Sequence, residues 1–214
     1  RPYEVIKHKE WQDENDVVKA LIDLEQKVFL QGIANNIGIL GDTIKKVKPD
    51  LIFNLCETFN KKRHFESSIA SFCALMQIPY TGACPMTIQL CQDKSISKKI
   101  IPFHEIKTPT FSIAKPQTKN IIINKLPAIV KPLASEASEG ICASSFVKTR
   151  KECISRVNYI HKKLQSSALI EDYINGYDTY VGIIGDKNIT VFEPVIVEYK
   201  KYSQKKPNIA TYNA

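Results

Sequence analysis

Hydrophobic positions in the first part of the chain switch between helical and strand-like spacing. Between Asp13 and Phe29, apolar residues recur every three or four positions, which predicts an amphipathic helix. The apolar run 51–55 has the length of a buried strand, and Pro49 separates it from the helix before it. The other expected elements are a strand over 28–33, a helix capped at 41–43, a helix over 65–76 and a strand over 78–82. This alternation predicts a small open α/β domain.

The second part of the chain has a different pattern. A strand over 127–132 ends at a lysine and a proline and leads into a loop of small and polar residues over 133–140. A hairpin turn at Gly185 joins two segments of alternating polarity. The other expected elements are a helix over 93–101, an extended segment from 108, a strand over 142–147, a helix over 150–164 and a strand over 168–174. This layout is an antiparallel-rich α+β pattern, so we expect two domains, residues 1–92 and residues 93–214.

Composition excludes several classes of protein. The 214 residues are 43% hydrophobic and 24% charged, the ordinary mixture of a globular chain, which excludes a disordered tail. Apolar runs such as 121–123 are far shorter than the ~18 residues needed to span a bilayer, so we expect no membrane partner. The six cysteines lie mostly within apolar runs and show no metal-ligand spacing, which predicts buried, reduced thiols and a cytoplasmic protein. No signal peptide is visible, and a first residue other than Met predicts a missing natural N-terminus.

The net charge of +8 arises entirely in the second part of the chain. Residues 1–92 contain 11 basic and 11 acidic side chains, whereas residues 93–214 contain 19 basic and 11 acidic ones. This asymmetry favours an anionic partner, although a lysine-rich solvated surface would give the same count. Only four of the 30 basic residues are arginine, and aromatic residues are not interleaved with the basic ones. A nucleic-acid-binding domain is therefore the weaker alternative to a protein that binds smaller phosphates.

No glycine-rich nucleotide fingerprint and no nucleophile elbow is present, but three separate pieces fit a phosphate-containing ligand. Lys94 opens a helix, and Lys131 ends a strand, where it can reach a phosphate as a point charge. The loop after Lys131 can offer backbone N–H groups to the same oxygens. Glu171 and Asp178 lie on a strand and just past a turn, where they could accept hydrogen bonds from a base amine and a ribose hydroxyl. Taken singly, each piece also fits a solvated surface.

The residues of these pieces and their order along the chain resemble the ATP-grasp carboxylate–amine ligases, and in particular the D-alanine–D-alanine ligase group. The matching stretches are 49–57, 78–82, 93–94, 108–111, 129–132, 138–141 and 170–178. The likeness runs from about Val17 to the last residue. It implies a small open α/β (pre-ATP-grasp) N-terminal domain, followed by an α+β ATP-grasp domain that is incomplete at its C-terminus.

The resemblance implies a role for each matching residue. Lys94 and Lys131 correspond to the two lysines that contact ATP phosphates. Ser138, which is implied to be both catalytic and nucleotide-binding, and Gly140 fall in the loop that closes over these phosphates. Glu66 corresponds to an acid of the substrate-side motif in the first domain. The implied adenine and ribose contacts are the Glu171 side chain, the backbones of Asp172 and Ile174, and the Asp178 carboxylate.

The sequence also departs from the family pattern. The family's His-Gly and Gly-Glu-Asp-Gly motif is replaced by residues 56–67, in which only Glu66 matches, and the N-terminal glycine-serine segment is not found before Val17. Both departures leave the substrate open. Asp178 stands where Glu is commoner, and the loop is poor in glycine. The chain stops at Ala214, before the positions at which the family holds a further lysine and its magnesium ligands, so no metal ligand is assigned within this chain.

The resemblance implies an ATP-dependent ligase that joins a carboxylate to an amine through an acyl phosphate, with ATP and Mg²⁺ as cofactors. A small amino acid or carboxylate is the implied substrate, and a homodimer is the implied assembly. The chain by itself is expected to bind nucleotide weakly and to turn over little or not at all. A nucleotide-binding but non-catalytic ATP-grasp relative is the second hypothesis, and a basic nucleic-acid-binding domain is the third.

Overall fold

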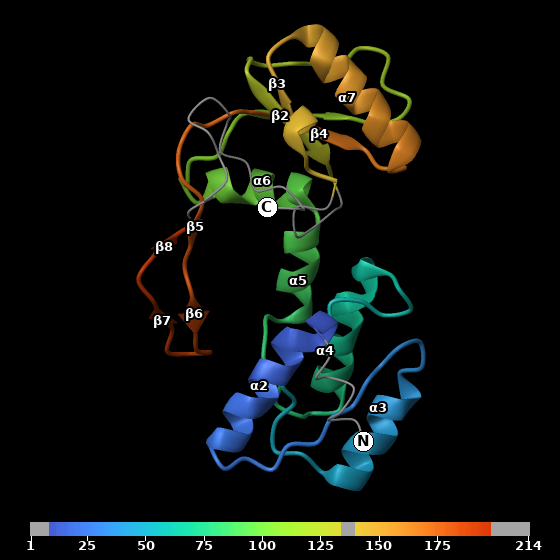
Figure 1. Cartoon of the computed structure of the whole chain (residues 1–214), viewed down its shortest axis with the longest axis vertical. Helices are drawn as coiled ribbons and strands as arrows, with labels where there is room; N and C mark the ends of the chain where they lie inside the picture. The colour runs from blue at the N-terminus through green and yellow to red at the C-terminus, as the bar shows by residue number, and fades with distance from the viewer. Residues whose placement is uncertain (1–8, 134–139, 198–214) are drawn as a thin grey trace. The chain divides into compact units, whose positions relative to one another are not determined.

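The computed structural model describes residues 9–133 and 140–197. The chain divides into two compact units, Arg1–Gln89 and Leu90–Ala214, and the division falls inside helix α5 (Pro85–Gln92). Each unit has a hydrophobic core of its own. Figure 1 shows the elements of both units.

The first unit is mainly helical. Its elements are η1 (Lys9–Trp11), α2 (Gln12–Asp23), α3 (Gly38–Val47), η2 (Arg63–Phe65), α4 (Glu66–Leu75) and the first turns of α5. Helices α3 and α4 pack together around Leu40, Ile44, Ile69 and Cys73. Gly41 permits this packing, because a Cβ atom there would lie 3.2 Å from the Phe72 ring. The expected cap at 41–43 is therefore wrong, since α3 begins three residues earlier and buries Gly41.

The strands expected in the first unit are reduced to one parallel bridge, between Ile52 and Tyr80. The Ile52 N–H donates to the Pro79 carbonyl at 2.9 Å, and the Thr81 N–H donates to the Ile52 carbonyl at 3.0 Å. Within the described ranges, segment 28–33 forms no strand and α2 ends at Asp23 rather than near residue 29. Segment 51–55 is apolar as a buried strand would be. A parallel strand also needs hydrogen-bonded neighbours along its length, and among the described residues this segment has only the one bridge.

The second unit is built on a four-stranded antiparallel sheet in the order β1-β4-β2-β3. The strands are β1 (Phe111–Ala114), β2 (Ala128–Pro132), β3 (Phe146–Val147) and β4 (Ala168–Asp172), with η3 (Ala143–Ser145) before β3. Helix α7 (Arg150–Lys163) covers one face of the sheet, and α6 (Lys94–Phe103) lies on the other side (Figure 1). The elements expected over 127–132, 150–164 and 168–174 are confirmed, whereas the strand expected over 142–147 is mostly the η3 turn.

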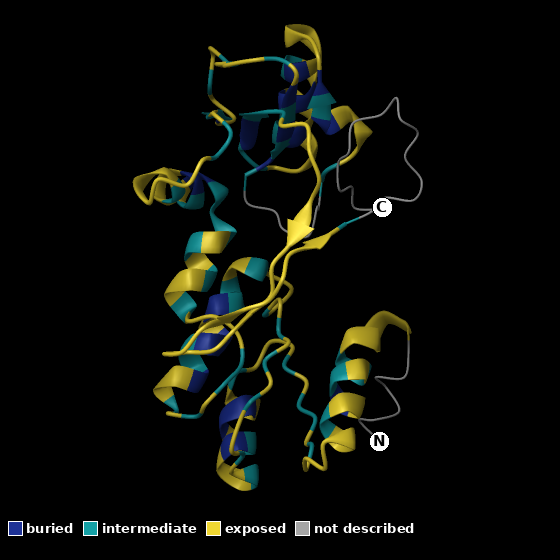
Figure 2. Ribbon diagram, turned by 90° about the vertical axis from the view of Figure 1, so that its left-hand side faces the viewer, coloured by how far each residue is buried: buried dark blue, intermediate teal, exposed yellow. Residues whose placement is uncertain are grey.

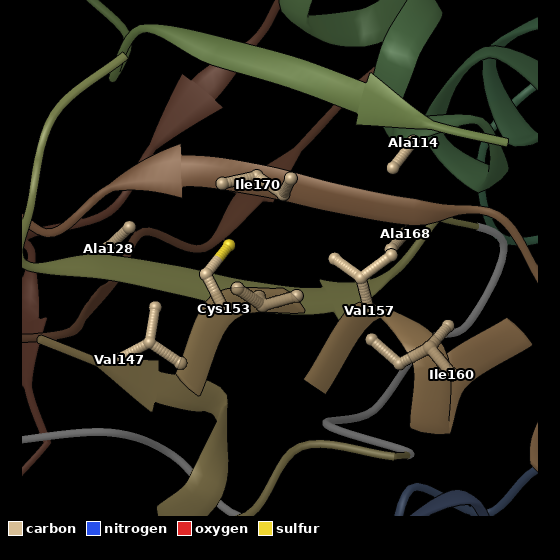
Figure 3. Close-up of a cluster of buried hydrophobic side chains, with 9 residues drawn as sticks. Ala114, Ala128, Val147, Cys153, Val157, Ile160, Ala168 and Ile170 are labelled. Atoms are coloured by element: carbon tan, nitrogen blue, oxygen red, sulfur yellow. The ribbon is translucent and has the colours of Figure 1, made fainter. Parts of the chain in front are cut away.

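The core of this unit lies between α7 and the sheet. Figure 3 shows Cys153, Val157 and Ile160 of α7 directed at residues from all four strands, among them Ala114, Ile170 and Val147. A capping box starts α7: the Thr149 hydroxyl accepts from the Glu152 N–H, and the Glu152 carboxylate accepts from the Thr149 N–H. Because strand side chains alternate between faces, this core uses every second residue of β2 and β4 and leaves the others for the opposite face.

A long hairpin follows the sheet, and its residues are exposed (Figure 2). Strand β5 (Thr179–Tyr180) pairs with β8 (Val195–Ile196), and β6 (Ile183–Ile184) pairs with β7 (Thr190–Val191). The two pairs differ in register by one residue, which marks a β-bulge between them. The turn expected at Gly185 is confirmed, with φ of +131°, a conformation that side-chain-bearing residues rarely adopt.

The expectation that the cysteines are buried is wrong for half of them. Cys73 and Cys153 are buried and Cys56 is half-buried, whereas Cys84, Cys91 and Cys142 are exposed. The three exposed thiols lie directly before α5, near the end of α5 and directly before η3. Among the helices that the structure describes, none combines the length and the apolar character that crossing a bilayer requires.

Candidate functional site

The face of the sheet opposite α7 brings charged residues from two strands together. Glu171 of β4 lies opposite Phe111 of β1 on one side and Ile129 of β2 on the other. Lys131 is two residues beyond Ile129 and opposite Leu169. Alternation therefore directs Lys131 and Glu171 to the same face, away from the α7 core.

Three charged side chains meet on this face. The Lys131 Nζ forms an ion pair with Oε1 of Glu171, and the Lys98 Nζ lies 3.1 Å from Oε2 of the same carboxylate. Lys98 also donates to the Thr108 hydroxyl at 2.7 Å and lies over the Phe111 ring, 5.3 Å from its centroid. The side chains of Lys98 and Glu171 are only 10% and 11% exposed, and that of Lys131 is 21% exposed. The cluster is thus a largely desolvated group with two cations and one anion.

The two lysines determine the charge state of Glu171. Burial alone would raise the pKa of this carboxyl, because it disfavours the charged form. The ion pairs and hydrogen bonds with Lys131 and Lys98 outweigh burial, so that the pKa lies below its ordinary value. Glu171 is therefore ionised at neutral pH and presents only hydrogen-bond acceptors.

Lys98 belongs to this site, although the sequence analysis did not single it out. It is four residues after Lys94, so the two side chains lie on the same face of α6, one turn apart. The Asp93 side chain caps the helix by accepting from the N–H groups of Ser95 and Ile96 at 2.8 and 3.3 Å. The helical i, i+4 spacing after Lys94 was the available signal, and it was missed because Lys98 by itself looks like a surface lysine.

Lys94 is the first residue of α6 and is half-buried. Its position at the N-terminus of a helix adds the partial positive charge of the helix dipole to its own charge. The backbone N–H groups of the first turn are partly engaged by the Asp93 cap. Lys94 therefore reinforces the positive potential on the side of α6 that carries Lys98.

The backbone just after Glu171 leaves the sheet in an ordered way. The Asp172 N–H donates to the Thr110 carbonyl at 3.0 Å, and the Tyr173 N–H donates to the Pro127 carbonyl at 3.1 Å. Ile174 is exposed, and no backbone carbonyl in the described ranges accepts from its N–H. Segment 172–174 thus presents one backbone N–H donor, that of Ile174, three residues beyond the Glu171 carboxylate.

Ser138 falls outside the described residues, whereas Gly140 is described. Its φ is +72°, and an added Cβ atom would lie 2.8 Å from Pro132 and 2.9 Å from Leu164. Its carbonyl accepts a hydrogen bond from the buried guanidinium of Arg156, which also donates to the Ser145 hydroxyl at 3.1 Å. Glycine is therefore required at position 140.

Two expected site residues are not brought into the lysine cluster. Asp178 is exposed at the start of the hairpin, where its carbonyl accepts from the Val197 N–H at 2.9 Å. Glu66 is the first residue of α4 in the other unit, so it is described separately. In the part of the chain that the structure describes, no group of three or more His, Cys, Asp or Glu residues could hold a metal ion. The described residues therefore offer no ready-made set of carboxylate ligands for magnesium.

Comparison with known proteins gives the site a context. No protein-family model matches the chain. An uncharacterised protein of Sinorhizobium fredii is 29% identical over 148 residues, which cover 69% of this chain and 43% of that protein. A D-alanine–D-alanine ligase of Aquifex aeolicus is 26% identical over 179 residues, which cover 83% of this chain and 58% of that protein. The chain spans about half the length of these curated relatives.

Solved structures show the same fold. The VanG D-Ala:D-Ser ligase of Enterococcus faecalis matches with a TM-score of 0.57 and 19% identity, over 74% of this chain and 47% of that chain. The biotin carboxylase domain of a Hydrogenobacter thermophilus 2-oxoglutarate carboxylase, a complex with MgADP, matches with a TM-score of 0.54 and 19% identity, over 74% and 36% of the two chains. The expected fold class is confirmed: an ATP-grasp architecture of which this chain contains a part. By sequence the chain is similar to D-alanine–D-alanine ligases, and by fold it matches ATP-grasp ligases.

Proposed function

We propose that this chain is the nucleotide-binding part of an ATP-dependent ligase that joins a carboxylate to an amine. One observation supports the proposal above the others: Lys131, Lys98 and Glu171 form a largely desolvated cluster on the sheet face opposite α7. One buried and one half-buried lysine on a single carboxylate leave an excess of positive charge. A bound anion would balance this excess charge. A nucleotide supplies that anion and, in adenine, an amine for Glu171.

Each residue of the cluster has a task in this proposal. Glu171 accepts a hydrogen bond from the adenine amino group, and the Ile174 N–H donates to a ring nitrogen. Lys131 leaves Glu171 and binds a phosphate, together with Lys94. Asp178 binds the ribose, and the loop that contains Ser138 and ends at Gly140 closes over the phosphates. Backbone N–H groups of that loop would add donors to the phosphate oxygens. The loop would also keep water away from the phosphoryl group during its transfer.

The chemistry follows from the phosphates. A carboxylate oxygen of the substrate attacks the terminal phosphorus, and ADP leaves, which gives an acyl phosphate. The amine then attacks the acyl carbon, and phosphate leaves. The lysines offset charge on the phosphoryl oxygens during the first step. Magnesium, which the resemblance implies for the whole protein, would offset the charge of the phosphates when it is bound.

The substrate side is proposed more broadly. Glu66 is assigned to a small amino-acid or carboxylate substrate, whose amine it would pair with as an anion. The relatives include enzymes that join D-alanine to D-alanine, but residues 56–67 depart from their motif, so the acid and the amine are left as classes. A homodimer stays a prediction of the resemblance, and a cytoplasmic location stays a prediction of the cysteine pattern.

Calorimetric titration with ATP tests the nucleotide assignment. We expect Lys131→Met to weaken ATP binding by about tenfold or more, the scale of one lost charge-assisted phosphate contact. The methionine keeps the apolar stem, and Glu171 keeps its ion pair with Lys98, so the variant should stay folded. Lys119→Met, at an exposed position of the same unit, is the matched control and should bind like the wild type. Equal affinity in all three proteins would contradict the assignment.

A further inference from the structure

We propose that Lys98 is a positioning residue that keeps Glu171 in place as an ionised hydrogen-bond acceptor while Lys131 moves to the phosphates, and that it thereby sets a preference for adenine over guanine. The inference rests on the proposed function, because it concerns the same site. It adds Lys98, a residue to which neither the sequence pattern nor the resemblance gives a role, and a physical reason for the choice of base.

Lys98 is held more firmly than Lys131. Three contacts from three directions surround its ammonium group: the Thr108 hydroxyl at 2.7 Å, Oε2 of Glu171 at 3.1 Å and the face of Phe111. It is also nearly buried, on a helix whose first turn is capped. Lys131 has one ion pair, is twice as exposed and lies at the end of β2, next to the loop. Lys131 is therefore the lysine that can be exchanged.

The two lysines occupy different oxygens of the same carboxylate. Lys131 contacts Oε1 and Lys98 contacts Oε2. When no nucleotide is bound, both oxygens have a cationic partner, so an adenine amine must displace one of them. Departure of Lys131 frees Oε1 for the amine and supplies a cation to the phosphates in the same event. Lys98 then remains the one cation, among the described groups that face Glu171, that still balances its charge.

The charge state of Glu171 decides which base fits. An ionised carboxylate only accepts hydrogen bonds, which suits the 6-amino group of adenine and rejects the 6-oxo group of guanine. A protonated carboxyl can donate, and it can therefore bind the 6-oxo group. With both lysines gone, burial would raise the pKa of Glu171 and favour the protonated form. Lys98 is thus placed to determine discrimination between the bases without touching either one.

The test compares ATP and GTP binding by calorimetry in four proteins: wild type, Lys98→Met, Lys98→Arg and Lys99→Met. Wild type should prefer ATP at every pH between about 5.5 and about 8. Lys98→Met should lose at least about tenfold of that preference at neutral pH and regain it as the pH rises, because Glu171 then ionises. Lys98→Arg should restore the preference. Lys99→Met, an exposed neighbour on α6, should match wild type.

The outcomes separate the two proposals. If wild type binds no nucleotide, the proposed function fails. If wild type prefers ATP and Lys98→Met keeps the same ratio of ATP to GTP affinity at every pH, the role of Lys98 fails while the nucleotide site stands. A merely structural ion pair would lower both affinities together and leave their ratio unchanged.

A second measurement needs no variant, in case Lys98→Met does not fold. The carboxyl ¹³C shift of Glu171 in ADP-bound wild type, assigned through backbone connectivity, reports its protonation directly. The proposal expects the ionised shift across the whole pH range above. A protonated Glu171 at neutral pH in the complex would overturn it.

Discussion

At the scale of single residues, the account depends on a buried carboxylate between two lysines. Glu171 is stabilised in its charged form by Lys131 and Lys98, and neither lysine has another carboxylate partner among the ion pairs of the described residues. Removing the charge of Glu171 therefore leaves one buried and one half-buried ammonium group uncompensated. Buried ion pairs contribute little when replaced as a whole, but they are costly to break on one side.

Glu171→Gln is expected to lower the free energy of unfolding by about 3 kcal/mol at neutral pH. The folded-state pKa of Glu171 is lowered, so its contribution is present above the unfolded pKa of about 4.3 and is lost as the pH falls through the folded value. The difference between wild type and variant in urea unfolding should shrink in acid. Glu193→Gln, at an exposed position, is the control. A difference that stays constant down to the acid limit would contradict the ionised cluster.

Gly140→Ala is expected to destabilise the second unit by about 1–3 kcal/mol. The cause is the positive φ together with the close approach of Pro132 and Leu164. Gly176→Ala is the matched control, because no atom lies within 4 Å of its added Cβ and its φ is not in the positive range. Thermal or urea unfolding checks both. Equal stability of the two variants would show that the Gly140 backbone relaxes freely.

At the scale of elements, the N-terminus of α6 positions both of its lysines through one cap. The Asp93 side chain accepts from Ser95 and Ile96, and its pKa is lowered, first by the hydrogen bond from the Ser95 hydroxyl. A fixed first turn fixes the direction of Lys94, and of Lys98 one turn later. The cap therefore links a local sequence signal to the geometry of the site.

Asp93→Ala should cost about 1 kcal/mol of stability at neutral pH, the usual contribution of a side-chain N-cap. Because the folded pKa of Asp93 is lowered, the ionic part of this contribution is present above about pH 3.9 and disappears as the pH falls further. Asp93→Asn caps without titrating and should keep most of the stability with no such dependence on pH. An Asp93→Ala protein as stable as wild type would show that α6 does not depend on the cap.

Sequence patterns predicted the elements of the second unit better than those of the first. Strands β2 and β4 and helix α7 were found because alternation and helical periodicity report a one-sided core directly. Segment 51–55 was apolar enough for a strand, yet the pattern does not say how many neighbours it pairs with. In the site, Lys131 and Glu171 were predicted because each is a charged residue on a strand that suits one part of a nucleotide. Lys98 was missed because its burial follows from the packing of α6 against the sheet, which no local pattern encodes.

At the level of the whole molecule, the hairpin over 179–196 stands out among the described residues because its apolar side chains are exposed. Its paired residues Ile183 and Val191 are 65% and 61% exposed, and Ile184 on the other side is 62% exposed. A two-stranded hairpin by itself is marginally stable in water. Apolar surface of this kind is normally buried against another segment or another protein. The structure of this chain alone therefore presents a large apolar surface to solvent.

The double variant Ile183→Lys, Val191→Glu is expected to lower the fluorescence of a hydrophobic dye bound to the chain, because it replaces apolar surface by an opposite-charge cross-strand pair. Leu75→Lys removes a single exposed leucine of the first unit and should change the signal little, since it does not belong to an apolar hairpin. An unchanged signal in the double variant would contradict the prediction and indicate that this hairpin surface is covered in solution.

In the proposed site, a nucleotide takes the place of Lys131 on Glu171. A crystal structure of the chain with a non-hydrolysable ATP analogue tests this exchange. We expect the adenine amino group within hydrogen-bond distance of Glu171, Lys131 on a phosphate, and Lys98 still on Glu171 and Thr108. An analogue bound elsewhere, with Lys131 still paired to Glu171, would contradict it.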